Sequence, residues 1–267
     1  MRVSLPMHDL PELLDDHQRL WTAFRRLLRE EGLSDLPLAL EWPEDLGAAW
    51  RAPDLLFSQT CGYPLIRDLA GQVHLVGVPH YDAPGCAGYE YSSALIVRQE
   101  SEARSLADLR GKVAGFNERG SQSGYNALRH AVAPLAGGAA FFSAVQQTGR
   151  HEASIDAVTA GTIDIAAIDA VTYALIARYQ PARVAEIRVL GFTDRVAGLP
   201  FITSAQTSGS DLAALCRALV KLFVEPDLAA TRARLLLTGC SFPPESVYDA
   251  IEGQEQASLS LAYPELA

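Results

Sequence analysis

The chain has 267 residues, of which 49% are hydrophobic and 20% are charged, a balance that supports one or two hydrophobic cores and excludes a disordered chain. Its 22 basic and 32 acidic side chains give a net charge of −10, which argues against nucleic acid or an anionic membrane as a partner, because such surfaces bind clustered Lys and Arg. No apolar run is long enough for a membrane helix, and residues 1–6 lack the apolar stretch of a secretory signal, so we expect a protein that is not membrane-embedded.

The first third of the chain predicts strands that alternate with helical or Pro-containing segments. A short strand over 3–6 leads into a long helix, for which Asp9 and Glu12 form a capping-box pattern and Gly32 supplies a left-handed C-terminal residue. Apolar runs of strand length then follow at 38–40, 55–57, 73–78 and 93–97.

A second series of strands and helices begins after a short helix over 105–109 and a turn at Gly111. Strands are predicted over 113–116, 141–145, 163–168, 187–192 and 201–203, helices over 122–132, 152–160 and 170–179, and the remainder as mostly helical. Pro134 is expected to end the first of these helices. Strands repeatedly followed by helices predict an α/β fold, in which ligands bind outside the carboxyl ends of the strands.

Two of these strand ends carry hydroxyl groups at the start of a helix. Ser121 and Ser123 stand between the strand over 113–116 and its helix, and Thr60 stands after the strand over 55–57. Unpaired backbone N–H groups, the helix dipole and the hydroxyls could together cradle a small anion without a lysine. Capping of its own helix is the alternative for both Ser121 and Thr60.

Further candidates follow other strands. His151 lies at a helix start, where a neutral imidazole can donate, although a surface histidine is the alternative. Asp169 ends the strand over 163–168 and is either an N-cap or the acceptor for the acidic proton of a monohydrogen phosphate or phosphonate, a proton that sulfate lacks. Tyr81 lies in the loop after the strand over 73–78 and could form a pocket wall.

The sequence gives no signature of a metal site, a cofactor site or a common enzyme class. HExxH, Walker A and GxGxxG motifs are absent, and the spacing of His74, His80, Asp82 and Cys86 fits no familiar ligand set. The four cysteines form no CxxC pair; they are either free thiols or, in an oxidising compartment, include a Cys61–Cys86 disulfide.

Three segments resemble the phosphate- and phosphonate-binding branch of the type 2 periplasmic binding proteins, the solute-capturing components of ABC importers. The first runs from Leu106-Ala107-Asp108-Leu109-Arg110-Gly111-Lys112-Val113-Ala114 through Asn117 to Ser121-Gln122-Ser123-Gly124-Tyr125. The others are Arg150-His151-Glu152-Ala153-Ser154 with the following Ala160-Gly161-Thr162 to Asp169 stretch, and Gly198-Leu199-Pro200-Phe201. Gln122 departs from the family pattern, which usually has Ser or Thr there.

The resemblance implies a two-lobed fold, each lobe a mixed sheet flanked by helices, with two crossover hinge strands and one anion bound in the cleft between the lobes. Lobe one would comprise residues 1–88 plus 190–267, and lobe two residues 89–189. Matched residue by residue, the ligand-binding set comprises Gln59, Thr60, Tyr81, Asn117, Ser121, Gln122, Ser123, Gly124, His151 and Asp169.

The function implied is capture of phosphate, phosphonate or a similar small oxyanion by hinge closure, without catalysis, metal or cofactor. An ABC permease would be the partner of an exported protein, and the resemblance implies a periplasmic location, whereas the missing signal leaves a cytoplasmic one open. The alternative is a cytoplasmic enzyme on the same fold, of the thiamine- or menaquinone-pathway type, for which His8, His151 and Asp169 are the acid–base candidates.

Overall fold

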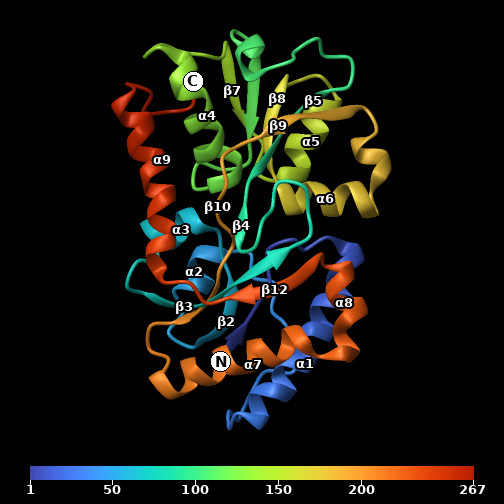
Figure 1. Cartoon of the computed structure of the whole chain (residues 1–267), viewed down its shortest axis with the longest axis vertical. Coiled ribbons are helices and arrows are strands. Elements are labelled where there is room, and N and C mark those ends of the chain that lie inside the picture. Colours follow the sequence, from blue (N-terminus) through green and yellow to red (C-terminus); the bar gives the residue numbers. More distant parts are fainter. The chain divides into compact units, whose positions relative to one another are not determined.

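The computed structural model describes residues 1–267, which divide into two compact units (Figure 1). Unit 1 comprises Met1–Asp82, Ala87–Tyr89 and Ala197–Val247, and unit 2 comprises Ala83–Cys86, Glu90–Val196 and Tyr248–Ala267. Each unit has its own five-stranded sheet with helices around it, which confirms the predicted α/β class. None of the helices is long and apolar enough to cross a membrane.

The C-terminal segment Tyr248–Ala267 belongs to unit 2, whereas the family resemblance implied that all of residues 190–267 belong to lobe one. Tyr263 and Leu266 are buried in the hydrophobic core of unit 2. The backbone carbonyl of Ala267 accepts hydrogen bonds from the N–H groups of Phe141 and Phe142, at 2.8 and 3.1 Å. Apolar burial and backbone pairing therefore hold this segment in unit 2.

The sheet of unit 1 is mixed and has the order β1-β2-β11-β3-β12. Its strands are β1 (Arg2–Val3), β2 (Leu55–Gln59), β11 (Phe201–Ser204), β3 (Val73–Tyr81) and β12 (Leu237–Ser241). β1 and β2 run parallel, whereas β11 is antiparallel to both β2 and β3. A strand from late in the chain thus lies at the centre of the sheet, between two early ones.

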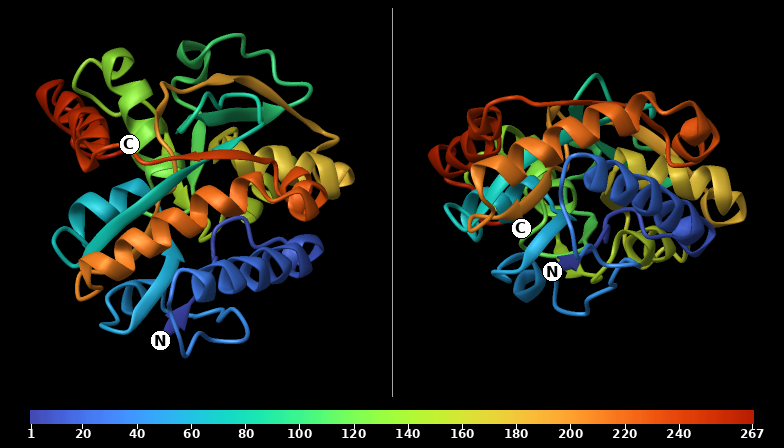
Figure 2. Two further views of the ribbon diagram at one scale, coloured as in Figure 1. Left: turned by 60° about the horizontal axis from the view of Figure 1, so that its bottom comes forward. Right: turned by 90° about the horizontal axis from the view of Figure 1, so that it is seen from below.

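The helices of unit 1 are α1 (Leu14–Glu30), α2 (Leu46–Trp50), α3 (Gly62–Arg67), α7 (Gly209–Val224) and α8 (Ala229–Arg234). The two long ones, α1 and α7, lie side by side (Figure 2). The predicted apolar stripe of α1 is buried, and Phe24 on it packs against Phe57 of β2 with ring centroids 4.7 Å apart. Phe57 in turn packs at 4.9 Å against Phe201 of β11, so that helix and sheet share one core.

The sheet of unit 2 is also mixed and has the order β7-β6-β8-β5-β9. Its strands are β7 (Ala144–Gln147), β6 (Val113–Phe116), β8 (Ile165–Asp169), β5 (Ser93–Arg98) and β9 (Ile187–Phe192). β6 is parallel to β7 and β8, and β5 is antiparallel to β8 and β9. The carboxyl ends of β6, β7 and β8 therefore meet at one edge of the sheet, together with the beginning of β5.

The helical elements of unit 2 are a π-helical turn (Gln122–Asn126) that continues into α4 (Ala127–Ala136), then α5 (His151–Thr159), α6 (Ala170–Tyr179) and α9 (Asp249–Ser260). Single turns of 3-10 helix at Leu106–Leu109 and Pro181–Val184 complete the unit. The short strands β4 (Glu90–Tyr91) and β10 (Val196–Ala197) form a separate two-stranded sheet where the chain passes between the units.

Several local predictions were wrong. Tyr81 is the last residue of β3 and does not lie in the loop after it. Residues 38–40 form no strand, and Leu38 is 72% exposed, so this apolar run has no core to enter. β12 lies in the stretch predicted as helical, because pairing with β3 overrides its local helical pattern. Pro134 lies inside α4, which ends only at Gly137 with φ of 67°. Asp9 caps no helix: Leu10 is the N-cap of the 3-10 turn Pro11–Leu13, Leu13 is the N-cap of α1, and neither makes a side-chain capping hydrogen bond.

Candidate functional site

The candidate residues of unit 2 gather at the sheet edge where three strands end. The π-helical turn follows β6, α5 follows β7 and α6 follows β8, with Ser121, Arg150 and Asp169 as their respective N-caps. Because parallel strands end at the same edge, these helix starts converge there. Ser93 lies at the same edge, because β5 runs antiparallel to β8 and its first residue, Ser93, is paired with Asp169.

Ser121 is the N-cap of the π-helical turn, which confirms the capping role predicted as the alternative. Its hydroxyl oxygen accepts a hydrogen bond from the N–H of Gly124 at 3.0 Å, and it lies 3.4 Å from the hydroxyl of Ser123. A hydroxyl that accepts in one bond still has a proton of its own to donate. Capping and donation to an oxyanion are therefore compatible at Ser121.

Ser123 connects the π-helical turn to α5 and to β5. Its hydroxyl lies 3.0 Å from Nε2 of His151, the first residue of α5. Its backbone carbonyl accepts a hydrogen bond from the Ser93 hydroxyl at 2.9 Å, and the Ser93 backbone N–H in turn donates to the Thr193 hydroxyl at 2.9 Å. These bonds fix the position of a hydroxyl and an imidazole at a helix start, where anions are stabilised.

Gly124 leaves room for the side chain of Asn117, which follows β6. A Cβ atom at position 124 would lie 1.9 Å from Oδ1 of Asn117 and 3.3 Å from Cε1 of His151. The Asn117 Oδ1 atom is buried and has no hydrogen-bond partner. Glycine at this position thus allows an amide and an imidazole to approach the same turn.

Asp169 is the N-cap of α6, and its Oδ1 accepts a hydrogen bond from the N–H of Thr172 at 2.8 Å. Its side chain is buried. Burial, together with the nearby negative charge of Asp169, raises the pKa of the Cys86 thiol to about 12. The thiol is therefore neutral at ordinary pH.

Gln122 differs from the other members of the set because its side chain points into the protein. Its Nε2 donates to Oε1 of Gln254 on α9 at 2.7 Å, and its Oε1 accepts from Nδ2 of Asn126 at 2.7 Å. The residue is 1% exposed. Only its backbone N–H is thus left to contribute to the sheet edge.

Unit 1 brings together the other three candidates, Gln59, Thr60 and Tyr81. Thr60 follows β2 and is buried, with its N–H donating to the Pro200 carbonyl at 3.1 Å. The N-cap of α3 is Cys61, so Thr60 does not cap that helix. The capping alternative for Thr60 is therefore wrong.

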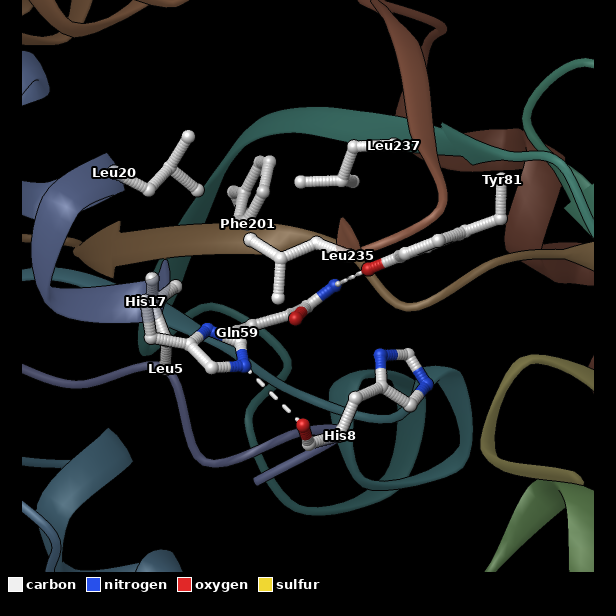
Figure 3. Close-up of a pocket in the computed structure, with 9 residues that line it drawn as sticks. All are labelled: Leu5, His8, His17, Leu20, Gln59, Tyr81, Phe201, Leu235 and Leu237. Atoms are coloured by element: carbon white, nitrogen blue, oxygen red, sulfur yellow. Dashed lines mark hydrogen bonds between the residues drawn. The ribbon is translucent and has the colours of Figure 1, made fainter. Parts of the chain in front are cut away.

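Gln59 fixes the side chain of Tyr81. Its Nε2 donates to the backbone carbonyl of Leu199 at 3.0 Å. It also donates to the hydroxyl of Tyr81 at 3.1 Å, the bond drawn in Figure 3. Since a carbonyl can only accept, the bond to Leu199 assigns the amide nitrogen to this position. The Tyr81 oxygen accepts from Gln59, and a hydroxyl that accepts can also donate its own proton to another group.

A pocket in unit 1 adjoins this pair (Figure 3). The space between its walls, including the part that is open to solvent, is about 290 Å³. Its walls are formed by Leu5, His8, His17, Leu20, Gln59, Tyr81, Phe201, Leu235 and Leu237. His8 packs edge-on against the Tyr81 ring at 5.2 Å between centroids. Its backbone has φ of 60°, in the left-handed region that non-glycine residues rarely adopt.

Sequence reasoning missed Ser93 and the pocket residue His17, and it named His8 only as an acid–base candidate of the enzyme alternative. Ser93 begins an antiparallel strand, so the rule that ligands bind at the carboxyl ends of strands does not indicate it. His8 and His17 come from a loop and a helix that follow β1, and no motif joins them to Gln59. All four cysteines are free thiols.

Comparison of the fold finds similar solved structures over nearly the whole chain. A binding protein component of an ABC phosphonate transporter from Pseudomonas aeruginosa has a TM-score of 0.75 and 15% identity, covering 98% of this chain and 87% of that one. PhnD1 from Prochlorococcus marinus in complex with methylphosphonate has a TM-score of 0.75 and 13% identity, covering 96% and 97%. XAC2383 from Xanthomonas citri, bound to ATP, has a TM-score of 0.70 and 15% identity, covering 98% of each chain.

At such identities these likenesses concern the fold, which is the two-lobed fold of type 2 periplasmic binding proteins, as predicted. No curated protein sequence is significantly similar to this chain. The family described as ABC transporter, phosphonate, periplasmic substrate-binding protein matches residues 18–241, well over half of the chain. The match favours solute binding over the enzyme alternative. The chain therefore belongs to the family of periplasmic, phosphonate-type substrate-binding proteins of ABC transporters.

Proposed function

We propose that this protein captures a small phosphorus oxyanion, a phosphonate or phosphate, through the hydroxyls, amides and imidazole of the two residue groups described above. The observation that carries the proposal is the 3.0 Å contact between the Ser123 hydroxyl and His151 Nε2, at an edge where the π-helical turn, α5 and α6 all begin. Helix starts stabilise anions through their N–H groups and dipoles, and a π-helical turn is frequently found at functional sites.

The donors in unit 2 are the hydroxyls of Ser121 and Ser123, the His151 ring and the backbone N–H of Gln122. In unit 1, Tyr81 and Thr60 add hydroxyls. None of these groups carries a formal positive charge apart from a protonated His151, so affinity would come from charge-assisted hydrogen bonds in a desolvated site. The net charge of −10 is thus no obstacle to local anion binding.

Asp169 would give selectivity by accepting the acidic proton of a monohydrogen phosphate or phosphonate. A carboxylate near a bound dianion is repulsive unless a proton lies between the two. Sulfate has no such proton at neutral pH. We therefore expect sulfate to bind far more weakly than a phosphorus oxyanion of the same size.

Calorimetry on ligand-stripped protein with phosphate, phosphite, methylphosphonate and sulfate tests the proposal. Saturable one-to-one binding of at least one phosphorus oxyanion is expected, with Ser123→Ala weakening it about tenfold or more, as loss of a hydrogen bond to a charged group does. Ser260→Ala is the matched control, because that hydroxyl is exposed and donates only within its own helix, to Ala257. Absence of saturable binding across the four anions would refute the proposal.

Hinge closure of the two lobes around the ligand, delivery to an ABC permease and a periplasmic location are part of the same proposal. They rest on membership of the family, whose description names a transporter and the periplasm. Small-angle scattering with and without a bound oxyanion measures closure. Mass spectrometry of the incubated ligands separates a pure binder, which returns its ligand unchanged, from an enzyme.

A further inference from the structure

The pocket of unit 1 has walls that suit an uncharged apolar group. Aliphatic and aromatic surface comes from the loop after β1, from α1, from β11 and from the β12 region, through Leu5, Leu20, Phe201, Leu235 and Leu237. The polar members of the wall are two imidazoles, the Gln59 amide and the Tyr81 phenol. The wall contains no carboxylate that could pair with an ammonium group, and no lysine or arginine.

His17 adds no charge to the wall. Its Nε2 lies 3.2 Å from the backbone carbonyl of His8, to which it must donate, because a carbonyl can only accept. Nδ1 is thus the unprotonated nitrogen of the neutral ring, and it is buried without a hydrogen-bond partner. Burial lowers the pKa of His17 to about 4, so the ring is neutral at physiological pH.

The hydrogen bond from His17 to the His8 carbonyl holds the loop that contains His8 at the pocket. His17 on α1 holds the His8 carbonyl, and the His8 ring packs against Tyr81 (Figure 3). Tyr81 is in turn held by Gln59. The wall of the pocket therefore includes Tyr81, whose hydroxyl is assigned above to the oxyanion.

We propose that this pocket is the subsite for the substituent on phosphorus, and that it selects a small uncharged apolar group such as methyl or ethyl. The inference rests on the proposed function, since it concerns the part of the ligand that the oxyanion donors do not hold. Its aliphatic and aromatic walls offer apolar contacts to a short alkyl group.

Two ligand pairs test the selectivity of the subsite. Methylphosphonate and phosphite differ only by a methyl group in place of hydrogen, and burial of one methyl group strengthens binding about fourfold. 2-Aminoethylphosphonate would place an ammonium against walls without a carboxylate, and we expect it to bind about a hundredfold more weakly than ethylphosphonate. Equal affinities of methylphosphonate and phosphite, or tighter binding of the amine, would overturn the inference.

Enlarging the pocket supplies a test by gain of binding. Leu235→Ala removes part of the wall, and we expect it to shift the preference from methylphosphonate towards propylphosphonate by about tenfold. The control is Leu222→Ala on α7, an equally buried leucine outside the pocket wall, which should leave the preference unchanged. If both variants show the same preference as the parent protein, the substituent does not enter this pocket.

Failure of the inference differs from failure of the proposed function. If no phosphorus oxyanion binds the parent protein, the proposed function is wrong and the subsite falls with it. If the anions bind but neither the ligand pairs nor Leu235→Ala shows selectivity, only the subsite is wrong. A crystal structure with methylphosphonate, in which the methyl carbon lies against Leu235 and Phe201, is the expected direct result; water in the pocket and the methyl group elsewhere would contradict it.

Discussion

Arg129 donates from Nη2 to Oδ1 of Asn126 at 2.7 Å, and this bond sets the direction of a chain of amide hydrogen bonds. Because a guanidinium can only donate, Oδ1 of Asn126 must face it, and Nδ2 is left to donate to Gln122. Gln122 then donates to Gln254 on α9. The turn that carries Ser121 and Ser123 is thereby held from behind by the C-terminal helix.

Gln122→Leu should destabilise the protein by about 1–3 kcal/mol, because it leaves Nδ2 of Asn126 and Oε1 of Gln254 buried without this partner. Urea unfolding measures the change. Gln146→Leu, at an exposed position of β7, is the control and should change stability by less than about 0.5 kcal/mol. Equal stability of the two variants would show that the amide chain contributes nothing.

Gly124→Ala should destabilise unit 2 and weaken oxyanion binding, because its Cβ would lie 1.9 Å from Oδ1 of Asn117. Forced side-chain displacement of this kind typically costs about 1–3 kcal/mol. Gly120→Ala in the same loop meets nothing within 4 Å and serves as the control. Adding Asn117→Ala to Gly124→Ala should recover stability; a double variant as unstable as the single one would contradict the steric explanation.

The free energy of unfolding should decrease as the pH is lowered, because burial disfavours the protonated form of His17 in the folded protein. Its pKa is lowered to about 4 in the folded protein from its ordinary value of 6.5, so the unfolded chain binds the proton more readily between these values. The neutral ring contributes fully above pH 6.5, and the contribution declines as pH falls to about 4, by about 3 kcal/mol in total. Urea unfolding of the parent and of His17→Leu at pH 7 and pH 4.5 should show a smaller decline in the variant; equal declines would exclude this role.

Gln59→Met and Tyr81→Phe should both weaken oxyanion binding through the Tyr81 hydroxyl, which Gln59 holds in position. Tyr81→Phe removes a donor hydroxyl, and loss of a hydrogen bond to a charged ligand corresponds to about a tenfold loss or more. Gln59→Met removes the amide that holds the Tyr81 oxygen at 3.1 Å. Calorimetry on the double variant should find no more loss than in Tyr81→Phe alone, whereas additive losses would mean that Gln59 acts independently. Tyr179→Phe, at the end of α6, is the control.

The sequence predicted best the features that depend on local pattern. The α/β alternation, the strands at 55–57, 93–97 and 113–116 and the helix over 170–179 all follow from periodicity and turn residues, and the structure contains each of them. Ser121 and Asp169 were recognised as potential N-caps because Ser and Asp favour that position, and both accept the expected bond.

Features that depend on distant partners could not be predicted in this way. β12 is a strand because it pairs with β3, more than 150 positions earlier in the chain. The inward orientation of Gln122 depends on Gln254, 132 positions away. The neutral state of His17 depends on burial and on the bond to His8, neither of which a motif encodes.

The central place of β11 in the sheet of unit 1 has a consequence for how the chain folds during synthesis. The edges of β2 and β3 that pair with β11 lack this partner until Phe201–Ser204 has left the ribosome. The intervening residues 90–196 contain every strand of the sheet in unit 2, so that sheet can assemble first. Chaperones that shield exposed strands would therefore be needed most by the N-terminal part of the nascent protein.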